Sequence, residues 1–146
     1  MEFIEITWQT DHYRQEMQLR NRLLRQPLGL TFTDEDLLAE RNELHFGVLS
    51  ADQLVACVVA VPLGSHRAKI RQMVVDDEFQ ARGVGSFLLQ NTEATLLERG
   101  FSILELHARQ TALGFYDRMG YQQVGDEFIE VNLPHFKMTK HLTAGR

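Results

Sequence analysis

The sequence predicts a mixed α/β fold with a central, mostly antiparallel sheet flanked by helices. Strand-like and helix-like patterns follow one another in the order strand, two helices, three strands, helix, strand, short helix and two strands. The fourth strand leads through a helix into the fifth, and such a path joins parallel strands by a right-handed crossover. Other strands are joined by short turns, which favours antiparallel pairing.

At the N-terminus we expect one strand and one long helix. Residues 3–8 alternate apolar and polar side chains, as in an edge strand. Residues 11–26 place apolar side chains at helical spacing, and Thr10 or Asp11 can cap that helix. Pro27 is expected to end it, because the residue before a proline disfavours helical backbone angles.

A second, short helix and a hairpin come next. The helix is predicted over 34–41, because Thr33 is a good cap and acidic side chains fill the first turn. Residues 44–50 and 54–61 are apolar strands joined by a tight turn, so we expect a hairpin. A further turn is predicted at 62–65, where proline and glycine occur together.

The middle of the chain supplies the crossover. Residues 66–75 are predicted as the fourth strand, and residues 83–99 as an amphipathic helix that Gly100 terminates. Regular alternation along a strand assigns its side chains to two faces. One face of the fourth strand is expected to carry Ala68, Ile70 and Val74, and the other Lys69, Arg71 and Met73.

The C-terminal third completes the sheet. Residues 102–107 are predicted as the fifth strand, and residues 110–119 as a short helix that stops before Gly120. The two last strands are predicted over 121–125 and 136–142, with a loop between them.

Composition narrows the classes of function. The chain has 146 residues and is expected to form a single domain, residues 1–146, while its net charge of −5 argues against non-specific nucleic-acid binding. No segment approaches transmembrane length and residues 1–8 lack an apolar signal core, so we expect a cytoplasmic protein with no membrane partner. Cys57, the only cysteine, lies in an apolar strand and is expected to be a core residue. The histidines show no metal-ligand spacing, so no metal site is predicted.

A glycine-rich turn opens the predicted helix 83–99. Its pattern is Gln-x-x-Gly-x-Gly from Gln80 to Gly85, directly after a β-branched strand. The first N–H groups of a helix have no intrahelical partner, and with the helix dipole they suit an anion such as a diphosphate. A dinucleotide fingerprint would need a third glycine where Leu88 stands, and the Gly-Lys-Ser/Thr ending of a P-loop does not occur in the sequence. Four basic residues are expected to surround this anion site: Arg67, Lys69, Arg71 and Arg82.

Two motifs in sequence order resemble those of the GNAT superfamily of N-acetyltransferases. Residues 75–85, Val-x-Asp-x-Phe-Gln-x-Arg-Gly-Val-Gly, resemble the family's motif A. Residues 104–121 resemble its second motif, a strand followed by a helix with Phe-Tyr and then Gly-Tyr. The likeness covers about residues 44–140. Asp77 stands where the family often has proline and Arg109 where it often has asparagine, but neither difference removes a backbone donor.

This resemblance implies that the fourth and fifth strands splay apart and that acetyl-CoA, the expected co-substrate, enters between them. Backbone groups of Met73 and Val75 would pair with the pantetheine arm, and the N–H of Val74 or a neighbour would donate to the thioester oxygen. The expected pyrophosphate donors are the N–H groups of Arg82, Gly83, Val84, Gly85 and Ser86, assisted by the side chains of Gln80 and Arg82. Arg109 is also expected at the cofactor.

The resemblance also assigns catalysis to Tyr116, whose phenol would protonate the departing thiolate as a general acid. The acceptor amine must lose a proton, and Glu127, Glu130 and His135 are candidate bases because the final loop could reach the cleft. Arg25, Phe32 and Glu127 are the expected acceptor-binding residues, with Arg22 as a further candidate.

The leading hypothesis is therefore an acetyl-CoA-dependent N-acyltransferase that acts by direct transfer on a small-molecule amine, and a homodimer is one expected assembly. The acceptor stays open, although the negative net charge leans towards small or cationic amines. A non-catalytic acyl-CoA-binding or sensor module on the same fold is the alternative, since a fold does not fix a function. A third hypothesis is an enzyme of another class that binds a nucleotide at the glycine turn.

Overall fold

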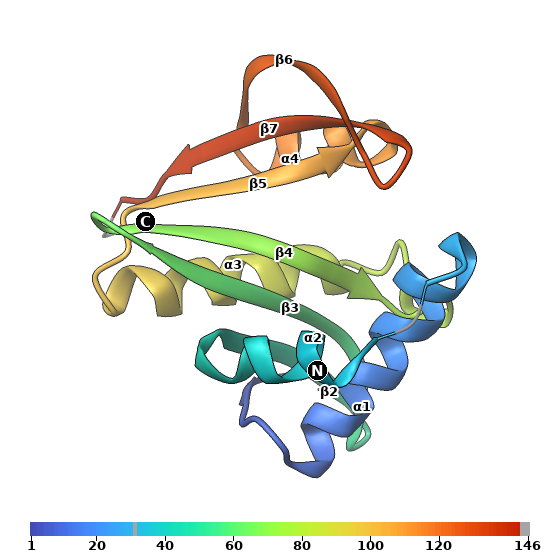
Figure 1. Cartoon of the computed structure of the whole chain (residues 1–146). Coiled ribbons are helices and arrows are strands. Elements are labelled where there is room, and N and C mark those ends of the chain that lie inside the picture. Colours follow the sequence, from blue (N-terminus) through green and yellow to red (C-terminus); the bar gives the residue numbers. More distant parts are fainter. Residues whose placement is uncertain (31, 144–146) are drawn as a thin grey trace.

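The computed structural model describes residues 1–30 and 32–143 and contains a seven-stranded sheet in the order β1-β2-β3-β4-β5-β7-β6 (Figure 1). β4 and β5 are parallel and every other neighbouring pair is antiparallel, which confirms the predicted fold class. The strands are β1 Glu2–Ile6, β2 Leu44–Ser50, β3 Gln53–Gly64, β4 Arg67–Val75, β5 Ile103–Arg109, β6 Gln122–Glu130 and β7 Leu133–His141. The α-helices are α1 Asp11–Arg20, α2 Asp34–Ala39, α3 Val84–Glu98 and α4 Leu113–Arg118.

The first helical region is less regular than predicted. Thr10 caps α1 by accepting from the Tyr13 N–H at 3.3 Å. The helix then widens into a π-helical turn, η1 Asn21–Arg25, and tightens into a 3₁₀ turn, η2 Gln26–Leu28, before it ends at Gly29. Pro27 therefore lies inside the helical region, in the first turn of η2, where a proline needs no N–H partner.

Other boundaries in the N-terminal half also differ from the prediction. β1 ends at Ile6, so Trp8 lies outside the strand, where its indole N–H donates to the Leu37 carbonyl at 3.2 Å. The predicted start of the second helix is confirmed by a reciprocal capping box between Thr33 and Asp36. β3 continues through Pro62, where a turn was expected. Its pairing with β2 ends at the pair Leu44–Ala60, so the edge of β3 beyond Ala60 needs no further N–H donors.

A bulge in β4 breaks the predicted alternation of its side chains. Gln72 has a φ of 55°, and the pairing with β3 shifts register between Cys57 and Val59. Before the bulge, Ile70 faces the α3 side of the sheet, but after it Val74 faces the α1 side. The assignment of Val74 to the face of Ile70 was therefore wrong, because one extra residue reverses every later side chain.

The last two strands are longer than predicted. Val131 and Asn132 both have positive φ and close a two-residue hairpin between β6 and β7. Glu127, Glu130 and His135 consequently lie on strands and not on a loop.

The core has two layers, one on each face of the sheet (Figure 1). α3 covers one face, where Leu88, Leu89 and Leu96 are fully buried against the central strands. α1 covers the other face, where Tyr13 and Leu19 pack on Cys57. No helix in the described part of the chain is long and apolar enough to cross a membrane.

Beneath α1 lies a buried ionic network. The Arg20 guanidinium donates to Glu16 and to Glu40 at 2.8 Å each, and the His45 ring contacts Glu16 at 2.8 Å. Burial opposes ionisation of Glu40, but the hydrogen bond and charge of Arg20 outweigh it and hold the pKa of Glu40 below its usual value. The oxygens of Glu16 and Glu40 and the His45 ring lie close enough together to ligate a metal ion, yet both carboxylates already pair with Arg20.

Replacing Arg20 with methionine is expected to lower the free energy of unfolding by about 3–5 kcal/mol, because two carboxylates are then buried without their guanidinium. A urea titration measures the loss. Arg14→Met on the same helix removes an exposed pair with Asp11 and is expected to cost less than about 1 kcal/mol. Equal losses in the two variants would contradict this account of the network.

Candidate functional site

The site begins where β4 and β5 separate. Their ladder joins Arg67–Ile70 only to Ile103–Leu106, and no further pair between them exists in the part of the chain that the structure describes. Beyond that point β4 continues beside β3 and β5 continues beside β7 (Figure 1). Two adjoining cavities, of about 780 Å³ and about 380 Å³, lie along this opening.

The larger cavity reaches the N-terminus of α3. Gly83, the N-cap, has a φ of 80°, and the first helical hydrogen bond runs from the Phe87 N–H to the Gly83 carbonyl at 3.0 Å. The N–H groups of the three intervening residues therefore have no intrahelical acceptor. A Cβ on Gly85 would lie 3.4 Å from the Met73 methyl, so glycine keeps this mouth open. The geometry suits an anion, as the glycine pattern predicted.

The larger cavity brings together eight of the ten predicted cofactor residues, although their roles stay predictions. The eight that line it are Met73, Val74, Val75, Gln80, Gly83, Gly85, Ser86 and Arg109. Val84 does not line it, because its side chain packs in the core with 2% exposure. Arg82 does not line it either, and its guanidinium lies over the Phe79 ring, 5.4 Å from the centroid.

Backbone alternation decides which groups of β4 face the opening. The Asp76 N–H donates to the Val55 carbonyl on β3 at 2.8 Å. Because successive residues of a strand point their backbone groups to opposite edges, those of Val74 also point to β3, while those of Met73 and Val75 point to the opening. The expected thioester donor is therefore a neighbour of Val74 rather than Val74 itself.

The side chain of Gln80 contacts its own turn. Its amide donates to the Val75 carbonyl at 3.0 Å and to the Asp77 carboxylate at 3.3 Å. Its expected help in holding a pyrophosphate stays a prediction, since in this arrangement the amide nitrogen donates within the turn.

The expected basic cluster around the glycine turn does not form. Arg67 pairs with Glu105 at 3.1 Å and Arg71 with Glu43 at 3.0 Å, so both guanidinium groups have carboxylate partners. Lys69 and Arg71 line the smaller cavity, which includes none of the residues at the start of α3. Arg82 alone of the four lies at the turn.

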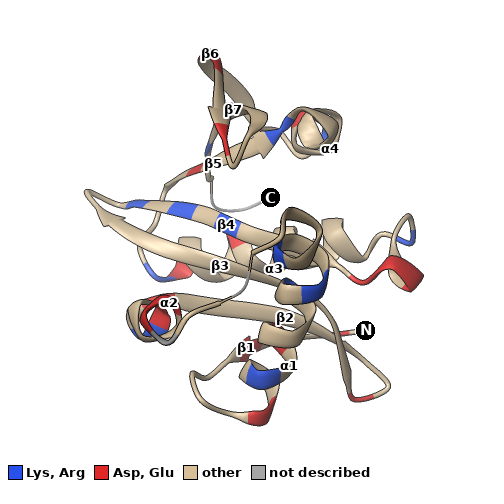
Figure 2. Ribbon diagram, turned by 45° about the vertical axis from the view of Figure 1, so that its right-hand side comes forward, with Lys and Arg blue, Asp and Glu red and all other residues tan. Residues whose placement is uncertain are grey.

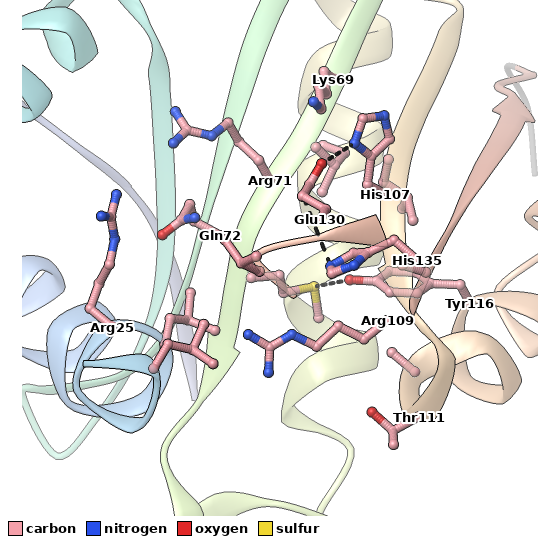
Figure 3. Close-up of a pocket in the computed structure, with 18 of the residues that line it drawn as sticks. Arg25, Lys69, Arg71, Gln72, His107, Arg109, Thr111, Tyr116, Glu130 and His135 are labelled. Carbon is pink, nitrogen blue, oxygen red and sulfur yellow. Dashed lines mark hydrogen bonds and ion pairs between the residues drawn. The ribbon is translucent and has the colours of Figure 1, made fainter. Parts of the chain in front are cut away.

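Tyr116 lies where the two cavities meet. It lines both, and its hydroxyl is 3.7 Å from the Met73 sulfur across the opening (Figure 3). Phe115 and Tyr121 hold its ring by edge-to-face contacts, with centroids 5.1 Å and 5.7 Å away. Burial raises the pKa of Tyr116 to about 12, so the phenol keeps its proton at neutral pH.

The smaller cavity contains a histidine–carboxylate cluster from three strands. Glu130 on β6 accepts from the His107 ring at 2.9 Å and lies 3.8 Å from Nε2 of His135 (Figure 3). His135 is almost fully buried, and its Nδ1 donates to the Leu133 carbonyl at 2.9 Å. His107 was not among the predicted site residues, although it stands two residues before Arg109 on the same strand and therefore shares its face.

The predicted acceptor residues separate into two groups. Arg25 lines the smaller cavity, and its guanidinium stacks on Phe32, 4.3 Å from the ring centroid. Glu127 is exposed on β6 and lines neither cavity, so the structure does not bring it to the site, and its contact with substrate stays a prediction. Arg22 pairs with Asp76 at 2.9 Å.

Comparisons with known proteins agree with this architecture. Residues 11–142 match the acetyltransferase (GNAT) domain. The uncharacterized protein YyaT of Bacillus subtilis (strain 168) is 31% identical over 112 residues, which cover 77% of this chain and 74% of that protein.

Solved structures share the fold at lower identity. Escherichia coli ElaA has a TM-score of 0.83 at 19% identity, covering 97% of this chain and 100% of that one. An aminoglycoside 6′-N-acetyltransferase complexed with coenzyme A has a TM-score of 0.81 at 17% identity, covering 100% of this chain and 99% of that one. Given the family match over most of its length, the chain belongs to the GNAT family of N-acetyltransferases.

Proposed function

We propose that this protein transfers an acetyl group from acetyl-CoA directly to the amine of a small-molecule acceptor. One observation carries the proposal: the opening between β4 and β5 places unpaired backbone groups, a helix mouth with free N–H donors and the buried phenol of Tyr116 along one continuous space. The related fold complexed with coenzyme A supports the same class of co-substrate.

The residues present fit a CoA thioester. The free N–H groups of Val84, Gly85 and Ser86 would hold the pyrophosphate with the positive end of the α3 dipole. The backbone edges of Met73 and Val75 would hold the pantetheine arm much as an added strand does. An N–H on that same edge would donate to the thioester oxygen as negative charge develops there. Arg109 lines both cavities and would lie close to the acyl end.

In the transfer step the acceptor nitrogen attacks the thioester carbonyl, the new C–N bond forms and the C–S bond breaks, and the second proton that leaves the nitrogen replaces the one that Tyr116 gives up. Tyr116 supplies the proton that converts the departing thiolate to a thiol. In water a thiol has a pKa of about 8.5 and a phenol about 10, a gap of about 2 kcal/mol. The burial that raises the pKa of Tyr116 also disfavours a thiolate, so the two groups stay comparable in acidity within the cavity.

The acceptor reaches the cavity as an ammonium ion and must lose a proton. Nδ1 of His135 donates to the Leu133 carbonyl, so in the neutral ring Nε2 carries the lone pair. Nε2 lies 3.8 Å from a Glu130 oxygen, so an acceptor nitrogen placed to one side of the pair would be within hydrogen-bond distance of both atoms. We assign proton removal to His135, with Glu130 stabilising the charge.

The decisive experiment measures release of the CoA thiol from acetyl-CoA across a panel of amines. Amine-dependent release supports the transferase. Acetyl-CoA binding without release from any amine supports the non-catalytic sensor module. Binding of ATP in place of acetyl-CoA supports a nucleotide enzyme.

Ser86→Asp is expected to preserve or raise the stability of the ligand-free protein, by up to about 1 kcal/mol, because an acid suits the first turn of a helix. The same charge repels a pyrophosphate, so the rise in Tm caused by acetyl-CoA should largely disappear. Thermal melts with and without acetyl-CoA measure both effects. Gln90→Glu adds an equal charge at an exposed position of α3 and should keep the rise. Retention of the full rise in Ser86→Asp would exclude the α3 mouth as the pyrophosphate site.

Tyr116→Phe is expected to lower kcat by about 100-fold or more while the acetyl-CoA-induced rise in Tm persists, because only the proton donor is lost. Steady-state CoA release measures kcat. Tyr121→Phe is the matched control, since it removes a buried hydroxyl bonded to Glu93 outside both cavities. It should reduce stability and leave kcat nearly unchanged. An unaltered kcat in Tyr116→Phe would disprove the acid assignment.

His135→Asn is expected to lower kcat/KM by about 100-fold at pH 7, because the acceptor must then lose its proton to water. The free amine increases about tenfold per pH unit below the ammonium pKa, so the deficit should shrink as pH rises. A pH profile of CoA release from pH 6 to 10 measures it. His141→Asn, at the exposed end of the same strand, should match the parent protein throughout. A deficit that stays constant with pH would show that His135 is not the base.

A further inference from the structure

The smaller cavity is basic on one side. Arg25 reaches it from η1, and Lys69 and Arg71 reach it from β4. Figure 2 shows basic positions along β4 beside the opening. Glu130 is the only carboxylate among the described residues that line this cavity. A ligand there therefore meets more positive than negative charge.

These cations are only partly compensated. Glu43 neutralises Arg71 at 3.0 Å, but Glu43 does not line the cavity. Among the side chains that the structure describes, no ion pair involves Arg25 or Lys69. Stacking on Phe32 fixes the plane of the Arg25 guanidinium and leaves its N–H edge for a ligand.

The two sides of the cavity differ in chemistry. In Figure 3, Arg25 and Arg71 lie on one side, and His107, His135 and Tyr116 lie on the other. The acetyl group would arrive beside Tyr116, so the reacting nitrogen must lie on the histidine side. The rest of the acceptor then extends towards the arginines.

Resting on the acetyl transfer proposed above, we propose that the natural acceptor is an amine that also carries an anionic group, a carboxylate or a phosphate. Its nitrogen faces Glu130 and His135, and its anion faces Arg25, Lys69 and Arg71. A plain amine would enter as a cation among cations that are only partly compensated, which is unfavourable, whereas an attached anion forms charge-assisted hydrogen bonds. The negative net charge of the whole chain favoured cationic acceptors, but the cavity itself has the opposite local charge.

Matched pairs of acceptors test this inference. L-phenylalanine is compared with 2-phenylethylamine, which lacks only the carboxylate, and O-phosphoethanolamine with ethanolamine, which lacks only the phosphate. CoA release gives kcat/KM for each at saturating acetyl-CoA. We expect the anionic member of at least one pair to have the higher kcat/KM, and the pair that responds identifies carboxylate or phosphate.

Variants then connect the preference to the basic side. The ratio of kcat/KM within the responding pair should fall about tenfold or more in Arg25→Gln and in Lys69→Gln, since each loses a charged hydrogen-bond donor. Comparing this ratio in a variant with the same ratio in the parent protein cancels the different intrinsic reactivities of the two amines. Arg14→Gln, an exposed change on α1 outside both cavities, should leave the ratio unaltered.

Three results would overturn the inference. Plain amines that react as well as or better than both anionic partners would remove it while leaving the acetyl transfer intact. A ratio unaffected by both variants would do the same. Absence of CoA release with every amine would refute the transfer itself, and the inference with it.

Discussion

The early end of pairing between β4 and β5 is the constraint on which the rest of this structure depends. A continuous ladder would satisfy the backbone groups of Met73 and Val75 and leave no space beside them. Because pairing stops at Ile70, those groups remain at an open edge, with the helix mouth of α3 at one end of the opening and Tyr116 across it. The bulge at Gln72 follows directly after the last pair, and it turns β4 away from β5.

Buried ion pairs hold α1, and η1, which continues it, forms the side of the cavities opposite β5. Arg20 joins α1 to the 3₁₀ turn Glu40–Asn42 through Glu40, and its guanidinium also lies 3.5 Å from the side-chain oxygen of Gln72 at the bulge. The same helical region continues into η1, which brings Arg25 to the smaller cavity. Buried ion pairs contribute less to stability than to fixing one arrangement over others. Here that arrangement sets the position of the basic side relative to β4.

Local sequence patterns predicted much of the fold and part of the candidate site. The helix 83–99, its glycine mouth and the parallel crossover follow from spacing, capping and turn chemistry within one continuous segment. The bulge was not predicted, because it depends on a positive φ at Gln72, and glutamine, unlike glycine, is not a residue type that indicates a positive φ. The β6–β7 hairpin was not predicted because Val131 also has a positive φ, and no glycine marks the turn. Glu127 was therefore expected at the acceptor, whereas Glu130 is the residue that lines the cavity. His107 meets Glu130 only through the pairing of β5 with β7, which no local pattern encodes.

Cys57, the sole cysteine, is fully buried beneath α1, and burial raises the pKa of its thiol well above the ordinary value. The thiolate is the nucleophile that attacks thiol reagents, so the native chain is almost inert to them. A colorimetric disulfide reagent added to this protein therefore measures the CoA thiol that is released from acetyl-CoA, with almost no background from the polypeptide. Once substrate is omitted, any slow colour that develops reports the rate at which the structure around Cys57 opens.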